Sequence, residues 1–205
     1  MSEAGYLAPT ASAEAEVRDR GSRFLARLVP CRDEAAAREA LAAIAREHPG
    51  ATHHCYAWRL GEPARERAAD AGEPAGTAGV PILRALQAAG VADALVVVTR
   101  WFGGTKLGKG GLARAYALAA REAIAATPVA PRVPAVELVV EVPFERLGPA
   151  RRLLAPPAVE LLAESYGERA RFVLRVARAR RAELEAALAD LGLAARDGGA
   201  ASTPT

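Results

Sequence analysis

Hydrophobic and polar residues recur along the chain with strand or helix periods, and these periods predict two successive groups of elements. In the first group, period-two alternation or continuous apolar runs predict strands at 23–30, 52–60 and 94–100. Helical spacing predicts helices at 33–46, from Thr77 onward, and from about Leu112 to Ala125. Asp33 and Thr77 precede the first two helices and are predicted to cap them. The strand at 94–100 is apolar throughout, which predicts burial on both of its faces.

The pattern breaks at 127–134, where three prolines in eight residues are typical of a linker, and then restarts. It predicts a strand at 136–142, a helix at 144–155, strands at 159–167 and 168–178, and a helix at 180–192 that ends at a glycine. This order is one strand short of a ferredoxin-like unit, because the residues after 195 show no strand pattern. We predict domains at 20–128 and 133–195, a long surface loop at 61–76, and flexible ends at 1–19 and 196–205.

The amino-acid composition is that of a globular protein and gives no sign of a nucleic-acid-binding or membrane protein. Of the 205 residues, 51% are hydrophobic and 25% are charged, as in ordinary globular proteins, and the formal net charge is +3. Such a small excess does not indicate a dedicated nucleic-acid binder, so a role of that kind would depend on a local basic patch. Two cysteines make no disulfide framework, and neither a signal peptide nor a membrane-spanning apolar run is visible. These features predict a cytoplasmic protein without a membrane partner.

The segment WFGGTKLGKGGLARAY (101–116) carries the strongest candidate chemistry. It holds five glycines and the chain's two lysines between a buried strand and a helix. A helix N-terminus exposes unpaired amides and partial positive charge, and glycines let a ligand approach the backbone. With Arg100, Lys106, Lys109 and Arg114 nearby, the amides of 108–111 indicate an anion site suited to phosphate. The segment lacks the standard P-loop and dinucleotide fingerprints, so a purely structural turn is the alternative.

Two further segments contain polar groups that could bind a ligand or could have purely structural roles. GEPAGTAG (72–79) offers the Glu73 carboxylate and the Thr77 hydroxyl to a ligand, although a loop glutamate and a helix-capping threonine are common. Along the strand at 52–60, alternation places His53 and Cys55 on one face and His54 on the other. These histidines are either hydrogen-bond donors at a site or packed strand residues. No spacing typical of a metal site is present, and no metal or cofactor is predicted.

Four motifs in order, SRF (22–24), HHCYAW (53–58), GEPAGTAG (72–79) and TRWFGGTKLGKGGLARAY (99–116), resemble those of the YigZ/IMPACT family. The resemblance covers the chain from about residue 22 to 192. It implies an α+β protein of two domains: an N-terminal α/β sandwich like the second domain of ribosomal protein S-five, and a C-terminal ferredoxin-like domain like the last domain of translocating elongation factors. Eukaryotic members act on translational control kinases through an additional N-terminal domain. Residues 1–21 do not match that domain, so the kinase-regulating partner is not expected.

The resemblance also implies one polar surface formed by three separate segments. Its members are His53, His54, Glu73, Thr77, Arg100, Gly103, Gly104, Gly108, Gly110, Gly111 and Arg114. Lys106 and Lys109 lie where the family motif varies, so their place in the site depends on the loop itself.

Three functions fit these observations. The first is a non-enzymatic protein whose basic glycine-rich groove binds RNA or a ribosome-associated partner and regulates translation. The second is an enzyme or binder of a phosphorylated small molecule or nucleotide, with Glu73 as base, although no known catalytic signature is present. The third is a protein-interaction module.

Overall fold

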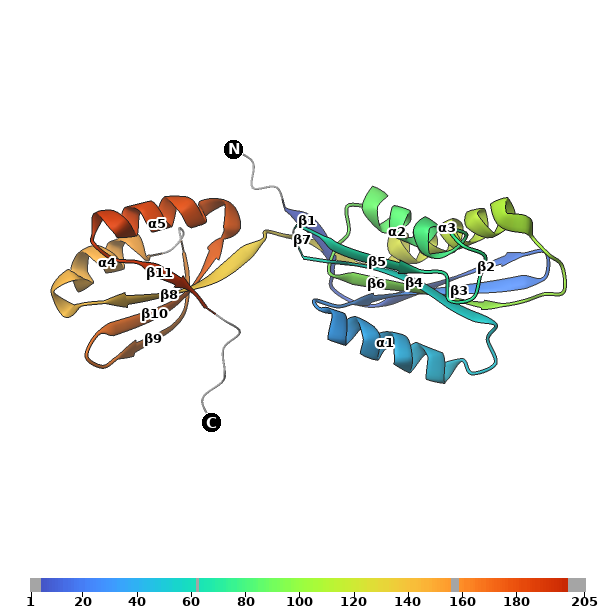
Figure 1. The fold of residues 1–205 in the computed structure, drawn as a ribbon, viewed down its shortest axis with the longest axis horizontal. Coiled ribbons are helices and arrows are strands. Elements are labelled where there is room, and N and C mark those ends of the chain that lie inside the picture. Colours follow the sequence, from blue (N-terminus) through green and yellow to red (C-terminus); the bar gives the residue numbers. More distant parts are fainter. Residues whose placement is uncertain (1–4, 62, 156–158, 199–205) are drawn as a thin grey trace. The chain divides into compact units, whose positions relative to one another are not determined.

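The structure is a computed structural model that describes residues 5–61, 63–155 and 159–198. It divides into an N-terminal unit, residues 5–132, and a C-terminal unit that begins at Val133. Both units combine β-sheet with helices, which confirms the expected two-domain α+β class (Figure 1).

The N-terminal unit is built on an antiparallel sheet of five strands in the order β2-β3-β6-β4-β5. Its elements are β1 (Tyr6–Pro9), β2 (Ala13–Asp19), β3 (Ser22–Pro30), α1 (Glu34–Glu47), β4 (His53–Leu60), β5 (Arg65–Ala69), α2 (Gly79–Ala88), β6 (Ala94–Trp101), α3 (Gly108–Ala126) and β7 (Val129–Arg132). Helix α1 lies on one face of the sheet, and α2 and α3 cover the other (Figure 1).

Strand β6 is the centre of this sheet, and its side chains enter both cores. Val96 and Val98 pack in the cluster under α2 and α3, whereas Leu95 and Val97 pack in the cluster under α1. All four are fully buried, and complete burial of such a side chain contributes roughly 1.5–3 kcal/mol. The predicted burial on both faces is therefore confirmed, and helices on both sides of the sheet provide it.

Three segments differ from the sequence-based expectation. Residues 6–9 and 13–19 were expected to be flexible, but they form β1, which pairs with β7, and β2, which pairs with β3. The predicted linker at 127–134 contains β7, and the predicted loop at 61–76 contains β5 at the sheet edge. Charged alternation in RERAA (65–69) and the prolines around β7 conceal these strands, because neither segment has an apolar face.

The C-terminal unit has the ferredoxin-like order of elements and strands. It comprises β8 (Ala135–Val142), η1 (Phe144–Arg146), α4 (Leu147–Leu153), β9 (Glu160–Tyr166), β10 (Ala170–Ala177), η2 (Arg178–Arg180), α5 (Arg181–Asp190) and β11 (Ala195–Asp197). The sheet order is β11-β8-β10-β9, antiparallel throughout, with both helices on one face (Figure 1).

The final strand, which the pattern does not indicate, is present. Strand β11 adds three residues to the edge of β8, so Arg196 and Asp197 are ordered rather than flexible. Gly192, at φ +66°, ends α5 as predicted and turns the chain toward β11. Residues 199–205, also expected to be flexible, lie outside the described residues.

Candidate functional site

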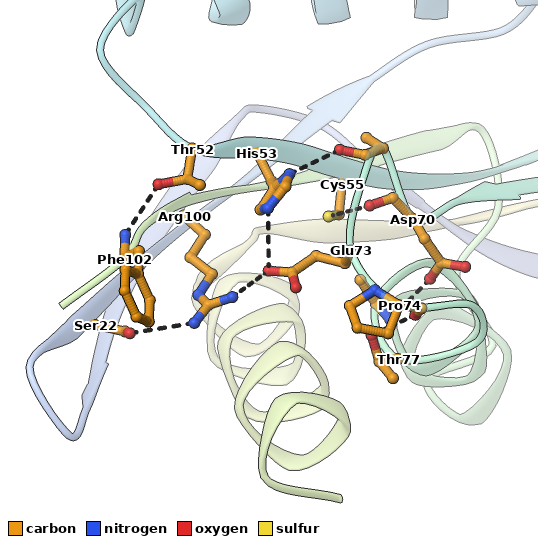
Figure 2. A network of polar contacts seen from close by, with 12 residues as sticks. Ser22, Thr52, His53, Cys55, Asp70, Glu73, Pro74, Thr77, Arg100 and Phe102 are labelled. Atoms are coloured by element: carbon orange, nitrogen blue, oxygen red, sulfur yellow. Dashed lines mark hydrogen bonds and ion pairs between the residues drawn. The ribbon is translucent and has the colours of Figure 1, made fainter. Parts of the chain in front are cut away.

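A buried ion pair between β6 and the loop that precedes α2 is the centre of the candidate site. Arg100 donates from Nη1 to Oε1 of Glu73 at 2.5 Å, and from Nη2 to the Ser22 hydroxyl at 3.3 Å (Figure 2). Only 6% of the Arg100 side chain and 3% of the Glu73 side chain are exposed. Charges buried this deeply depend on each other, because neither has water to replace its partner.

The same carboxylate oxygen accepts a hydrogen bond from α3. The Tyr116 hydroxyl donates to Glu73 Oε1 at 2.8 Å, and the Cys55 thiol lies 3.3 Å from that hydroxyl. Burial raises the pKa of the Cys55 thiol to about 12, and it also raises the pKa of Tyr116. Both groups therefore stay protonated at neutral pH, and Cys55 is not a nucleophile in this state.

His53 faces the ion pair from β4, directly across the ladder from Arg100. Its Nδ1 donates to the Ala71 carbonyl at 2.9 Å, and its Nε2 lies 4.0 Å from Glu73 Oε1 (Figure 2). Gly72, at φ +94°, lets the loop pass over this ring, because a Cβ there would lie 2.9 Å from Nδ1. The Ala71 carbonyl thus fixes the His53 ring with its Nε2 directed at the Glu73 carboxylate.

His54 does not join this group. Its Nδ1 lies 3.1 Å from the Thr99 hydroxyl, and the neighbouring Tyr56 packs in the core under α1. Burial lowers the pKa of His54, so its neutral form is favoured. Strand alternation places the two histidines on opposite faces, and the structure does not bring His54 together with His53 and Glu73.

The loop before α2 is organised by Asp70 rather than by Thr77. The Asp70 carboxylate accepts hydrogen bonds from the amides of Gly76, Ala78 and Gly79 at 2.8–2.9 Å. Burial alone would raise the pKa of Asp70, but these three amides hold it below its ordinary value. Asp70 thereby supplies the hydrogen-bond acceptor expected of a helix cap.

Thr77 has a different role from the predicted cap. Its hydroxyl donates to the Pro74 carbonyl at 2.6 Å, and α2 has no side-chain hydrogen bond from its N-cap residue, Ala78. The side chain is buried within its own loop (Figure 2). Thr77 thus stabilises the turn that brings Glu73 to Arg100.

The glycine loop leads into α3 earlier than predicted. The helix begins at Gly108 rather than near Leu112, so Gly110 and Gly111 lie in its first turn. Leu107 is the N-cap residue and offers no capping side chain, which leaves the first amides without a side-chain acceptor. Lys106, Lys109 and Arg114 are exposed around this turn. This arrangement has the geometry of an anion-binding helix terminus.

Glycine is required to a different degree at each position of the loop. Gly104 and Gly108 adopt φ values of +85° and +69°, where glycine is favoured. Gly110 has no positive φ, and a Cβ there would meet only the Arg114 guanidinium at 3.5 Å, an ordinary contact. At Gly111 a Cβ would lie 3.1 Å from the Leu107 Cβ, so that neighbour would have to shift slightly.

Gly103 packs directly on the turn between β2 and β3. A Cβ at Gly103 would lie 1.9 Å from the backbone carbon of Gly21, and the Gly103 amide donates to the Ser22 hydroxyl at 3.2 Å. Arg20 and Gly21 form that turn with φ values of +45° and +80°. The contact brings the exposed Arg20 to the glycine loop, and no motif of the sequence predicts this.

The arrangement offers two kinds of chemistry. The ion pair with Tyr116 and Ser22 is an interior polar network, whereas the surface beside it presents amides and bases to an anion. Within the described ranges, no group of three or more histidine, cysteine or acidic side chains is placed to hold a metal ion. In the same part of the chain, no helix is both long enough and apolar enough to cross a membrane.

Comparison with known proteins places the chain in a family. Residues 20–124 match the family described as the Impact N-terminal domain, and residues 140–192 match a domain of unknown function (DUF1949). A protein of Escherichia coli (strain K12) described as IMPACT family member YigZ is 34% identical over 190 residues, which cover 90% of this chain and 92% of that protein. The chain belongs to the IMPACT family.

Other IMPACT relatives are similar at comparable levels. A Thermus thermophilus protein described as an IMPACT family member is 44% identical over 156 residues, covering 76% of this chain and 84% of the relative. A solved structure described as that of a hypothetical protein superposes with a TM-score of 0.70 and 30% identity over 96% of this chain and 98% of its own. The similarity to that solved structure therefore extends through both units of the chain.

Proposed function

We propose that this IMPACT protein is a non-enzymatic, RNA-binding regulator of translation that acts in the cytoplasm. The main support for this proposal is the contact between Gly21 and Gly103, which brings Arg20 close to the basic side chains around the first turn of α3. We call Arg20, Lys106, Lys109 and Arg114 the basic end. All four are exposed, and no ion pair engages any of them among the described residues.

The chemistry of the basic end favours a phosphodiester chain. Four separated cations and a set of helix amides suit several successive phosphates better than a single one. Phe102, 47% exposed, lies beside these charges and offers a ring on which an unpaired base can stack. The likeness of both units to domains of the translation machinery, implied by the family resemblance, favours RNA or a ribosome-associated partner.

The state of the ion pair favours a binding role over catalysis. Glu73 Oε1 already accepts hydrogen bonds from Arg100 and Tyr116, and both partners are buried. A general base needs access to a substrate proton, whereas this carboxylate is engaged within the fold. Its proposed role is to fix the base of the loop that carries the basic end.

RNA binding is tested by titrating a fluorescent single-stranded RNA into the full-length protein at several salt concentrations. We expect affinity to fall steeply with salt, by a logarithmic slope of about 0.7 for each phosphate contact. Replacing Lys106, Lys109 and Arg114 by alanine is expected to weaken binding and to reduce the slope by about 2. Replacing Arg32, Arg46 and Arg84, which are exposed on or near α1 and α2, removes the same charge elsewhere and is expected to change little.

Two results would contradict this proposal. If RNA does not bind at low salt, the basic end is not an RNA site. If both triple variants weaken binding equally, the interaction reflects net charge alone. A partner captured from lysate that persists after nuclease treatment would instead favour a protein-interaction module.

A second candidate is a small phosphorylated ligand bound at α3 alone. The uncapped first turn favours it, because one phosphate can satisfy several of those amides. Incubation with nucleotides and Mg²⁺ tests whether such a ligand is also a substrate. Turnover that disappears in Glu73→Gln while circular dichroism shows a folded protein would support the enzyme, and turnover that persists in that variant would remove Glu73 from any catalytic role.

A further inference from the structure

A charged cavity in the C-terminal unit lies far along the sequence from the basic end. It has a volume of about 420 Å³, within the range of roughly 300–1,000 Å³ that is usual for small-molecule sites. Val139 of β8 lines it, and its charged lining residues are Arg146, Arg169, Arg196, Glu141 and Glu145. The family motifs that identify the N-terminal site include none of these residues.

Arg146 is fixed in the wall of this cavity. Its Nη1 donates to the Leu191 carbonyl, just beyond the end of α5. A Cβ at Gly192 would lie 2.7 Å from the same nitrogen, so the glycine that ends the helix also leaves room for the guanidinium. One arm of the planar group is thus anchored, and its remaining N–H groups are available to a ligand.

Among the described residues, no ion pair engages the other charged side chains of the cavity. Arg196 lies opposite Val139 in the ladder, on the sheet face away from the helices, and Arg169 precedes β10. In the described C-terminal unit, ion pairs engage the arginines Arg151, Arg175, Arg180 and Arg181. None of those pairs includes the five charged residues of the cavity, even though arginines and glutamates line it together.

This combination selects the chemistry of a ligand. Guanidinium groups bind phosphate oxygens through paired, charge-assisted hydrogen bonds. Glu141 and Glu145 would repel further phosphates, but carboxylates accept hydrogen bonds from N–H groups of a base edge. With three arginines and two glutamates, the lining suits one phosphate group together with a base that offers donors.

We propose that this cavity binds a purine mononucleotide, specifically one with a guanine base. The arginines hold the single phosphate, and one glutamate accepts from the adjacent N1–H and N2–H groups of the base edge. Uracil presents only one N–H between two carbonyl oxygens, so a uridine nucleotide fits the carboxylates less well. Binding here is independent of the RNA-binding role proposed for the N-terminal unit.

The test is isothermal titration of the full-length protein at low salt with GMP, UMP, GTP and inorganic phosphate. We expect GMP to bind more tightly than the other three. The double variant Arg169→Ala/Arg196→Ala should weaken GMP binding at least about tenfold, because each charge-assisted hydrogen bond contributes on the order of one such factor. The control Arg152→Ala/Arg178→Ala removes two exposed arginines that do not line the cavity and should leave the affinity unchanged.

A third variant tests the base contact. Glu141→Gln/Glu145→Gln should remove the preference for GMP over UMP while phosphate still binds. The proposal is overturned if GMP does not bind at millimolar concentration, if phosphate or UMP binds as tightly as GMP, or if the control weakens binding as much as the cavity variant. Circular dichroism of each variant establishes that the unit is folded, and a preference for GMP that survives the glutamate variant also overturns the base assignment.

Discussion

Replacing Glu73 with alanine is expected to destabilise the N-terminal unit by about 3–5 kcal/mol, the usual cost of removing one partner of a buried ion pair. We expect the whole of this destabilisation, because the Arg100 charge would stay buried without its partner. Only 6% of the Arg100 side chain is exposed, and its remaining side-chain acceptor is the Ser22 hydroxyl at 3.3 Å. The Tyr116 hydroxyl also loses its acceptor. Since domains are stable by only about 5–15 kcal/mol, this single change would remove a large part of the total.

The assay is urea unfolding followed by tryptophan emission. The chain has two tryptophans, Trp58 and Trp101, and both lie in the N-terminal unit, so the signal reports that unit alone. The double variant Glu73→Leu/Arg100→Met should recover most of the loss, because an apolar pair leaves no buried charge behind. A loss below about 1 kcal/mol for Glu73→Ala would show that water reaches Arg100 and would refute the role assigned to the pair.

The remaining predictions concern single groups of the N-terminal unit. Gly103→Ala should lower the urea midpoint strongly because its Cβ would overlap the Gly21 backbone, whereas Gly110→Ala should stay folded; equal effects would contradict the packing difference. The Cys55 thiol should resist thiol reagents in the folded protein at pH 8, since its pKa is about 12, and rapid labelling without unfolding would contradict this. Because the folded-state pKa of Asp70 is depressed, its contribution to stability is present above the ordinary value of 3.8 and is lost as pH falls below it. The difference in unfolding free energy between the wild type and Asp70→Asn should therefore shrink from pH 6 to pH 3, and a constant difference would show that the carboxylate charge contributes nothing.

Strong periodicity made most of the fold predictable. The apolar run of β6 and the alternation of β3 predicted both strands within one or two residues. Strand β5 could not be found in this way, because RERAA has no buried residue and lies at a sheet edge. Strand β11 is three residues long, which is too short for any period to be visible.

The sequence predicted several residues of the candidate site but not the contacts between them. Motif resemblance selected Glu73, Arg100 and His53, which the structure brings together around one carboxylate. It did not select Tyr116 as a partner of that carboxylate, since a tyrosine at helical spacing is ordinarily a core residue. Asp70 was missed for another reason: it lies several residues before α2, and its loop must fold back before its carboxylate can meet the helix amides.

The basic end depended on a contact that no local pattern encodes. Arg20 lies at the predicted start of the first domain, directly after the segment expected to be flexible, and the predicted site does not include it. Its connection to Gly103 depends on the approach of two glycine backbones, and that approach is set by the pairing of β3 with β6. Sequence periods do not report how closely two turns approach.

The central claim, that the basic end binds RNA, is tested most directly by NMR of the ¹⁵N-labelled full-length protein titrated with a short single-stranded RNA at low salt. If the basic end binds RNA, the largest amide shifts will occur at Arg20, Gly21 and residues 103–111, and α1 will be unaffected. Shifts that centre on α1 or on the C-terminal unit, or no shifts at all, would contradict it.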